Sequence, residues 1–121
     1  EAIFPESLDP ELRRDAGWIV NVTNDGWFGQ TSGPYQHLAQ ARLRAIESGL
    51  SFFRVANTGM SAIINPYGII TDQLALSVEG ILDVSLPLAL APTIVAQYPF
   101  LAPFLLVLFG FLLLAFLRGR R

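Results

Sequence analysis

The stretch VNVTNDGWFGQTSGPYQHLAQARLRAIESGLSFFRVANTG, residues 20–59, decides the fold of this chain. It starts within a β-branched and aromatic run at 18–23 and passes through a glycine-rich loop into a helix, which Pro34 opens and Gly49 closes. A second β-rich run follows at 51–56. The order strand, helix, strand is typical of layered α/β proteins, in which binding and catalysis are built where strands end.

Working outward from this stretch, we expect a small mixed sheet. Downstream, the sequence predicts short strands at 61–65, 69–73 and 80–84, with a Pro-Tyr-Gly turn joining the first two into a hairpin. Upstream, it predicts a short helix at 6–16, and the apolar strand 18–23 is expected to be buried within the sheet. The expected buried stripe of the helix at 34–48 contains Leu38, Ala41, Ala45 and Ile46.

Polar and aromatic side chains follow the first strand directly. Asn24 and Asp25 can cap a turn by accepting backbone hydrogen bonds, so this pair alone does not indicate a site. Trp27 and Phe28 are harder to accommodate, since a glycine-flanked loop rarely offers a pocket for two large rings. Trp27 could fold onto its own domain. Alternatively, Asn24, Trp27 and Phe28 could bind a substrate, with Trp supplying contact area and one directed N–H.

A charged residue interrupts the second strand. Arg54 lies in the middle of the apolar run 51–56, where an unpaired charge is costly. We expect a structural ion pair between Arg54 and a carboxylate such as Glu47, or one outside this chain. Arg44 and Glu47, three residues apart, can also pair on the helix surface. His37 is the only histidine, and a lone histidine near a loop is usually structural or solvated rather than catalytic.

Composition excludes several classes of function. The chain has 121 residues, of which 52% are hydrophobic, and its net charge is −2. Lys and Arg form no stripe outside the last four residues, so nucleic-acid binding has little electrostatic support. There is no cysteine, which excludes disulfides, thiolate metal sites and a cysteine nucleophile within this chain. We expect neither a metal nor a cofactor.

Residues 98–117 form a charge-free apolar run. As a helix these residues extend over about 30 Å, which matches the hydrocarbon core of a membrane. Arg118, Arg120 and Arg121 follow at once, so the C-terminus is expected in the cytoplasm and the preceding domain in the periplasm, at the bacterial inner membrane. Residues 86–97 are expected to be a connector at the interface. The alternative, a buried core helix, requires more cover than roughly 90 remaining residues provide.

Four motifs carry a family resemblance. They are NVTNDGWFG (21–29), GPYQH (33–37), ARLRAIESG (41–49) and RVANTGMSA (54–62), and they resemble the nitrilase, or carbon–nitrogen hydrolase, superfamily. The Trp-Phe-Gly loop, the Gln-His pair and the apolar C-terminal segment favour a membrane-bound acyltransferase over soluble amidases. The resemblance implies that residues 1–85 are the C-terminal part of an α/β domain, a nitrilase-like αββα sandwich, followed by one transmembrane helix.

The resemblance also implies a Glu-Lys-Cys triad, with Cys as nucleophile, Glu as general base and Lys as oxyanion stabiliser. The Cys is expected just upstream of Glu1, because Glu1-Ala-Ile-Phe-Pro resembles the end of the family's Cys-Tyr-Glu run. Glu1 would then support the active site, and the chain alone would be inactive.

The partners that the resemblance implies are lipids and the rest of the same polypeptide. The whole enzyme would move an acyl chain from a phospholipid, through a Cys thioester, to the N-terminal diacylglyceryl-cysteine of a lipoprotein. Two other interpretations stay open: a non-catalytic binding module tethered to the membrane, and another membrane-linked amidase of the superfamily.

Overall fold

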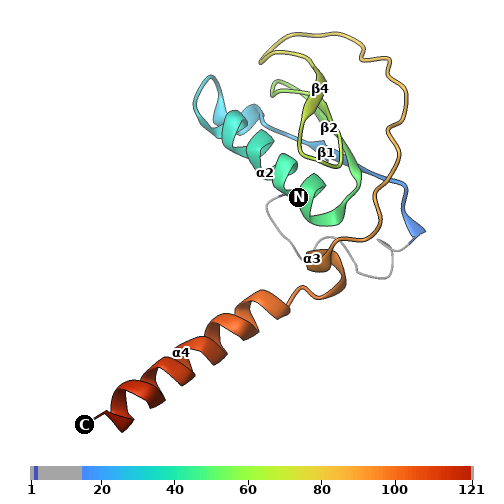
Figure 1. The fold of residues 1–121 in the computed structure, drawn as a ribbon. Helices are drawn as coiled ribbons and strands as arrows, with labels where there is room; N and C mark the ends of the chain where they lie inside the picture. Colours follow the sequence, from blue (N-terminus) through green and yellow to red (C-terminus); the bar gives the residue numbers. More distant parts are fainter. Residues whose placement is uncertain (1, 3–14, 121) are drawn as a thin grey trace.

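A four-stranded sheet forms the centre of our computed structural model, which describes residues 2 and 15–120 (Figure 1). The strand order is β1-β2-β3-β4; β1 and β2 are parallel, and the other neighbours are antiparallel. The α/β class expected from the sequence is confirmed. The strands are β1 (Trp18–Thr23), β2 (Ser51–Ala56), β3 (Ala62–Ile64) and β4 (Ile70–Gln73).

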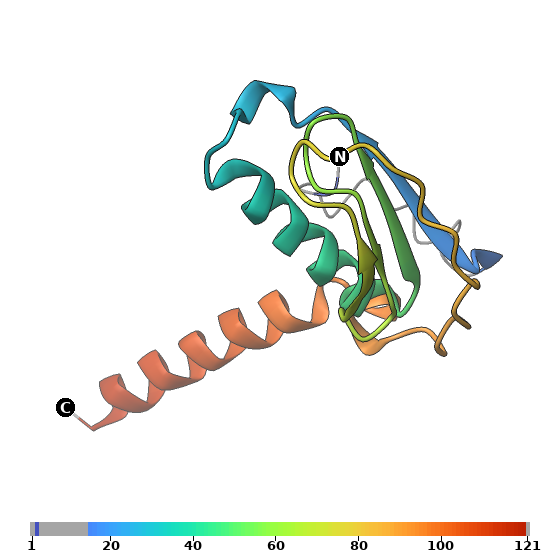
Figure 2. The same cartoon turned by 90° about the horizontal axis from the view of Figure 1, so that it is seen from above.

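Helix α2 (Gly33–Ser48) crosses over between the two parallel strands and covers one face of the sheet (Figure 2). Pro34 lies in its first turn, where a missing backbone N–H costs little. Gly49 ends the helix with φ of 72°, a left-handed conformation that glycine adopts without strain. The start and end that the sequence predicted for this helix are therefore confirmed to within a residue.

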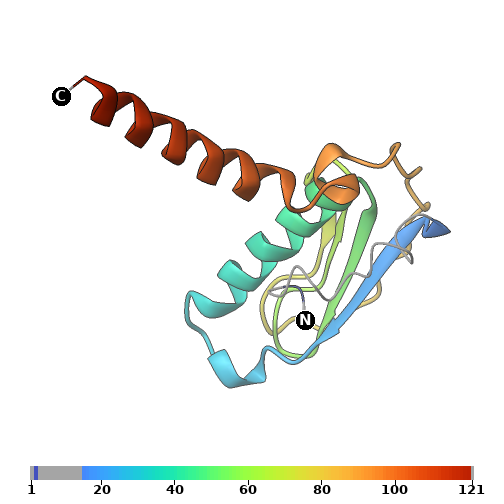
Figure 3. The ribbon, with the colours of Figure 1, turned by 90° about the horizontal axis from the view of Figure 1, so that it is seen from below.

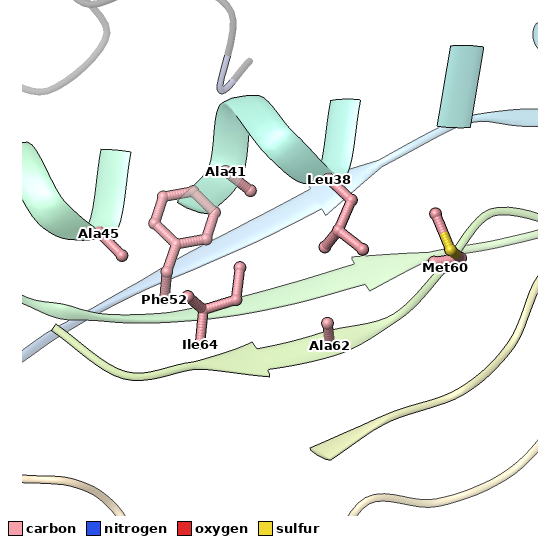
Figure 4. Packing of buried hydrophobic residues seen from close by; sticks show 7 residues of the cluster. All are labelled: Leu38, Ala41, Ala45, Phe52, Met60, Ala62 and Ile64. Carbon is pink, nitrogen blue, oxygen red and sulfur yellow. The ribbon is translucent and has the colours of Figure 1, made fainter. Parts of the chain in front are cut away.

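The hydrophobic core lies between α2 and the two central strands (Figure 4). Leu38, Ala41 and Ala45 are buried, as their helical spacing predicted. Ile46, which we expected beside them, is half exposed, because it lies on the flank of the helix against the turn between β3 and β4. The cluster comprises Leu38, Ala41, Ala45, Phe52, Met60, Ala62 and Ile64.

Within the described residues, strand β1 lies at the edge of the sheet, and there the prediction that it is buried is wrong. Trp18, Val20 and Val22 are exposed and alternate with half-buried residues. α2 covers the opposite face. On this face the segment after β4 reaches Ser51 of β2 through the Pro87 carbonyl, but no helix or strand among the described residues covers β1. The ring of Trp18 packs edge to face on Phe53, with centroids 5.7 Å apart.

The remaining predicted elements had mixed outcomes. The hairpin of β3 and β4 is present, with its turn closed by a bond from the Gly68 N–H to the Asn65 carbonyl. Residues 80–84 were predicted as a strand and form none, because no neighbouring strand among the described residues pairs with them. The helix expected at 6–16 falls outside the described residues except for its last two positions, of which Asp15 is helical.

The chain ends in two helices that leave the sheet. The short α3 (Ile94–Gln97) is followed by α4 (Leu101–Gly119), which extends away from the rest of the molecule (Figures 1 and 3). α4 begins three residues later than the apolar run that starts at Tyr98, because residues 98–100 form the turn between the two helices. With 19 residues, a mean hydropathy of 2.4 and no burial, α4 is long and apolar enough to cross a membrane.

We predict that Phe52 of the hydrophobic core contributes strongly to stability. Replacing Phe52, which is 2% exposed, with alanine should lower the free energy of unfolding by about 3–5 kcal/mol, because a large ring leaves a cavity under α2. Gln36→Ala on the exposed side of α2 is the matched control and should change it by about 0.5 kcal/mol or less. Denaturant unfolding of the intact protein measures both, and equal losses would contradict the position given to Phe52.

Candidate functional site

Two loops meet at the carboxyl ends of the parallel strands. One begins with Asn24 and Asp25 after β1, and the other with Asn57 after β2. Asn57 Nδ2 donates to Asn24 Oδ1 over 2.7 Å, and the Asp25 backbone N–H donates to Asn57 Oδ1 over 3.2 Å. Asn24 Oδ1 also accepts the Gly26 N–H at 2.9 Å. These amide groups therefore join the two loops into one edge, the usual place for a site in an α/β sheet.

Asp25 is a buried carboxylate at this edge, with only 1% of its surface exposed. Its Oδ2 accepts a hydrogen bond of 2.6 Å from Arg54 Nη2, and its Oδ1 lies 3.2 Å from His37 Nδ1. A charge-assisted bond of this kind is short and strong, and it offsets part of the cost of removing both charges from water. Asp25 thus connects three elements: its own loop, β2 and α2.

The predicted ion pair of Arg54 is present, but its partner is Asp25, and neither Glu47 nor a carboxylate outside this chain, the two partners that we named. Arg54 Nη1 also donates to Asn21 Oδ1 over 3.0 Å, across the register pair that aligns these two residues on β2 and β1. Glu47 precedes β2 at the opposite end of the sheet, where it pairs with Arg44 one helical turn away. Arg54 pairs with Asp25 because it lies toward the carboxyl end of β2, beside the loop that follows β1, whereas Glu47 lies before the start of β2.

His37 belongs to the same network, although a lone histidine gave little signal in the sequence. Its ring meets Phe28 edge to face, with centroids 4.7 Å apart. Two glycines make room for this packing. A Cβ at Gly33 would come within 2.5 Å of the Phe28 ring, and a Cβ at Gly59 within 2.1 Å of Asp25 Oδ2. No larger residue fits at either position without a rearrangement of the loop.

The side chain of Trp27 is 85% exposed, whereas hydrogen bonds fix the backbone of the loop around it. It lies in the short 3₁₀ turn η2 (Gly26–Phe28), where the Phe28 N–H donates to the Asp25 carbonyl over 3.0 Å. Thr31 Oγ1 donates to the Phe28 carbonyl over 2.8 Å. The indole therefore projects from a loop with a defined backbone. The alternative in which Trp27 folds onto its own domain is wrong for the part of the chain that the structure describes.

The predicted site residues thus divide into separate groups. Asn24, Trp27 and Phe28 lie together in the loop after β1, while Glu47 lies at the far end of α2. Glu1 falls outside the described residues. Sequence reasoning missed the role of Asp25, for which the available signal was that the carboxyl ends of two parallel strands share one edge. This edge therefore presents amide groups that can donate hydrogen bonds and the exposed indole of Trp27. The opposite charges of Asp25 and Arg54 neutralise each other beneath it.

Comparison with known proteins places this sequence in a family. The family model described as carbon-nitrogen hydrolase matches residues 1–94. Apolipoprotein N-acyltransferases of Rhodopseudomonas palustris and Bradyrhizobium diazoefficiens are 59% and 61% identical over 97 residues, which are 80% of this chain and 18% of each relative. That of Brucella suis is 55% identical over 87 residues, 72% of this chain and 16% of the relative.

This chain therefore spans less than a fifth of the length of these relatives. The match covers all four motifs and the edge that they build, from Asn21 to the loop after β2. The resemblance seen in the sequence is confirmed, and the chain belongs to the carbon–nitrogen hydrolase family.

Proposed function

We propose that this chain is part of a membrane acyltransferase that moves an acyl chain from a phospholipid to the N-terminal diacylglyceryl-cysteine of lipoproteins. The observation that carries the proposal is an exposed indole on a held loop, in the same chain as a helix of membrane-spanning length. The relatives' name, apolipoprotein N-acyltransferase, favours this activity over that of an amidase. An enzyme whose two substrates are both lipids also needs a membrane nearby.

The catalytic groups would come from the larger part of the polypeptide that this chain does not span. The chain has no cysteine, and we propose that the nucleophile lies just upstream of Glu1, with a Glu base, a Lys and Glu1 itself in support. The thiolate would attack the phospholipid ester carbonyl and release a lysophospholipid. The lipoprotein α-amine would then attack the thioester and release the thiolate. Neither step changes an oxidation state, so no redox cofactor is required.

The residues of the loop after β1 would contact substrate. Trp27 offers a large apolar face to an acyl chain. Phe28 is turned onto His37 and would act mainly by holding the loop, with only part of its ring toward substrate. Asn24 Oδ1 already accepts hydrogen bonds from the Gly26 N–H and from Asn57 Nδ2. We therefore assign the Nδ2 group of Asn24 as the one that donates a hydrogen bond to substrate.

The membrane arrangement belongs to the same proposal. α4 would cross the bacterial inner membrane with residues 101–117, the helical part of the predicted run 98–117, with residues 86–97 as connector and 118–121 as a cytoplasmic tail. The arginines at the end of α4 support a cytoplasmic C-terminus, and the domain of residues 1–85 would then lie in the periplasm.

An assay of the intact protein distinguishes this function from its alternatives. Purified protein in phospholipid vesicles should transfer a labelled acyl chain to a diacylglyceryl-cysteine peptide and form a thioester on the way. Small amides should be poor substrates. Hydrolysis of amides without transfer would instead indicate an amidase of the same family, and absence of both reactions would indicate a binding module.

Trp27→Ala should reduce acyl transfer while leaving the protein folded and inserted in the membrane. Full burial of such a side chain is worth about 1.5–3 kcal/mol, so the rate constant should fall roughly ten- to a hundredfold. Trp27→Phe, which keeps an aromatic face, should retain more activity than Trp27→Ala. Activities equal to that of the unchanged protein would contradict the role of Trp27.

The two half-reactions then show which substrate Trp27 contacts. Slow thioester formation would indicate the phospholipid donor. Normal thioester formation followed by slow transfer would indicate the lipoprotein acceptor.

A further inference from the structure

A separate exposed apolar surface lies at the end of α2 that is remote from Trp27. Leu43 and Ile46 of α2 are 49% and 47% exposed, and Tyr67 and Ile69, in the turn between β3 and β4, are 65% and 58% exposed. We call these four residues the α2–turn patch. Neither the loop after β1 nor the buried charge pair uses them.

The patch is one continuous surface, because the turn is docked on the helix. Arg42 Nε donates to the Gly68 carbonyl over 2.8 Å. A Cβ at Gly68 would come within 2.6 Å of Ile46 Cδ1, so the turn backbone lies directly against that side chain. Tyr67 and Ile69 flank Gly68 and therefore stand beside the exposed flank of α2.

The same end of α2 holds the segment that leads to α4. Thr93 Oγ1 donates to the Glu47 carbonyl, and the Leu90 N–H donates to the Gly49 carbonyl over 2.9 Å. Thr93 also caps α3 by accepting the Ala96 N–H at 3.1 Å. α3 is therefore fixed to the C-terminal end of α2, next to the patch, and α4 departs from there (Figures 1 and 3).

The length of α4 determines where a membrane surface would pass. Its 19 residues rise about 28 Å, which is close to the thickness of a hydrocarbon core. With α4 across the membrane, the residues just before it would lie near the lipid headgroups. Four apolar or aromatic side chains before α4 are at least half exposed: Ile94, Val95, Tyr98 and Phe100. Tyrosine is enriched in membrane proteins at the level of the headgroups.

We propose that the α2–turn patch rests on the surface of the phospholipid bilayer, so that the soluble domain contacts the membrane through this face as well as through α4. The inference depends on the proposed membrane function. The basis for the inference is that the patch and the connector to α3 meet at the same end of α2. There Ile46 contacts the turn between β3 and β4, and the carbonyl of the next residue, Glu47, accepts a hydrogen bond from Thr93 of the connector. The contact would fix the orientation of the domain, and with it the place of Trp27, relative to the bilayer.

The other uncovered apolar surface differs in kind and would take a different occupant. Trp18, Val20 and Val22 stand in strand alternation on the open face of the sheet, with Val55 on the neighbouring strand. A regular sheet face of this type packs against a second protein layer. The rest of the polypeptide would cover that face and leave the α2–turn patch to lipid.

Photo-crosslinking in the intact protein tests the proposal. p-Benzoylphenylalanine is placed singly at Tyr67 and at Leu43, and the protein is irradiated in vesicles of phosphatidylethanolamine and phosphatidylglycerol. Mass spectrometry then separates adducts to lipid from adducts to protein. Both positions should give several-fold more lipid adduct than Glu79, which is exposed in the chain after β4, while Trp18 should give adducts to protein. Two independent positions keep the test valid if one variant does not fold.

A position in α4 separates failure of this inference from failure of the proposed function. Phe109 should give lipid adducts if α4 crosses the membrane. Absence of lipid adducts at Phe109 would overturn the membrane proposal itself. Lipid adducts at Phe109 together with protein adducts at Tyr67 and Leu43, or with lipid adducts no more abundant than at Glu79, would overturn the contact proposed here and leave the function standing.

Discussion

The buried ion pair between Asp25 and Arg54 is the interaction on which the arrangement of the site depends. Both side chains are almost fully buried, and Arg54 Nη2 lies 2.6 Å from Asp25 Oδ2. Removing either partner alone would leave a charge without compensation in the interior, which costs several kcal/mol. The pair forms only when β1 and β2 lie parallel and in register, because the same guanidinium also contacts Asn21. The loop that carries Trp27 therefore has a defined place only in the folded sheet.

Helix α2 extends the influence of this pair across the domain. At its first turns His37 contacts the carboxylate of Asp25 and supports Phe28, which holds the loop. At its C-terminal end, the carbonyls of Glu47 and of the capping residue Gly49 accept hydrogen bonds from the connector to α3. One rigid helix thus relates the exposed indole to the segment that would enter the membrane. For an enzyme acting on lipids, this relation sets the distance between the site and the bilayer.

Local patterns predicted the elements, and long-range geometry decided the rest. β-branched runs, Pro34 and Gly49 were enough to find β1, α2 and β2, and the Pro-Tyr-Gly turn was enough to find the hairpin, since these signals act within a few residues. The partner of Arg54 could not be found in this way, because it depends on a pairing 29 residues apart that only the parallel register creates. The exposure of β1 has a similar cause: its sequence is that of a strand covered on both faces, but the described residues supply one covering layer.

A double-mutant cycle on the ion pair tests the central claim most directly. The free energy of unfolding of the intact protein is measured for Asp25→Asn, for Arg54→Met and for the double variant. Each single variant should lose about 3–5 kcal/mol, because one charge is left buried and unpaired. The double variant should lose little more than either single variant, so that the coupling energy is several kcal/mol. Additive losses, with a coupling energy within about 0.5 kcal/mol of zero, would contradict the claim that this pair organises the site.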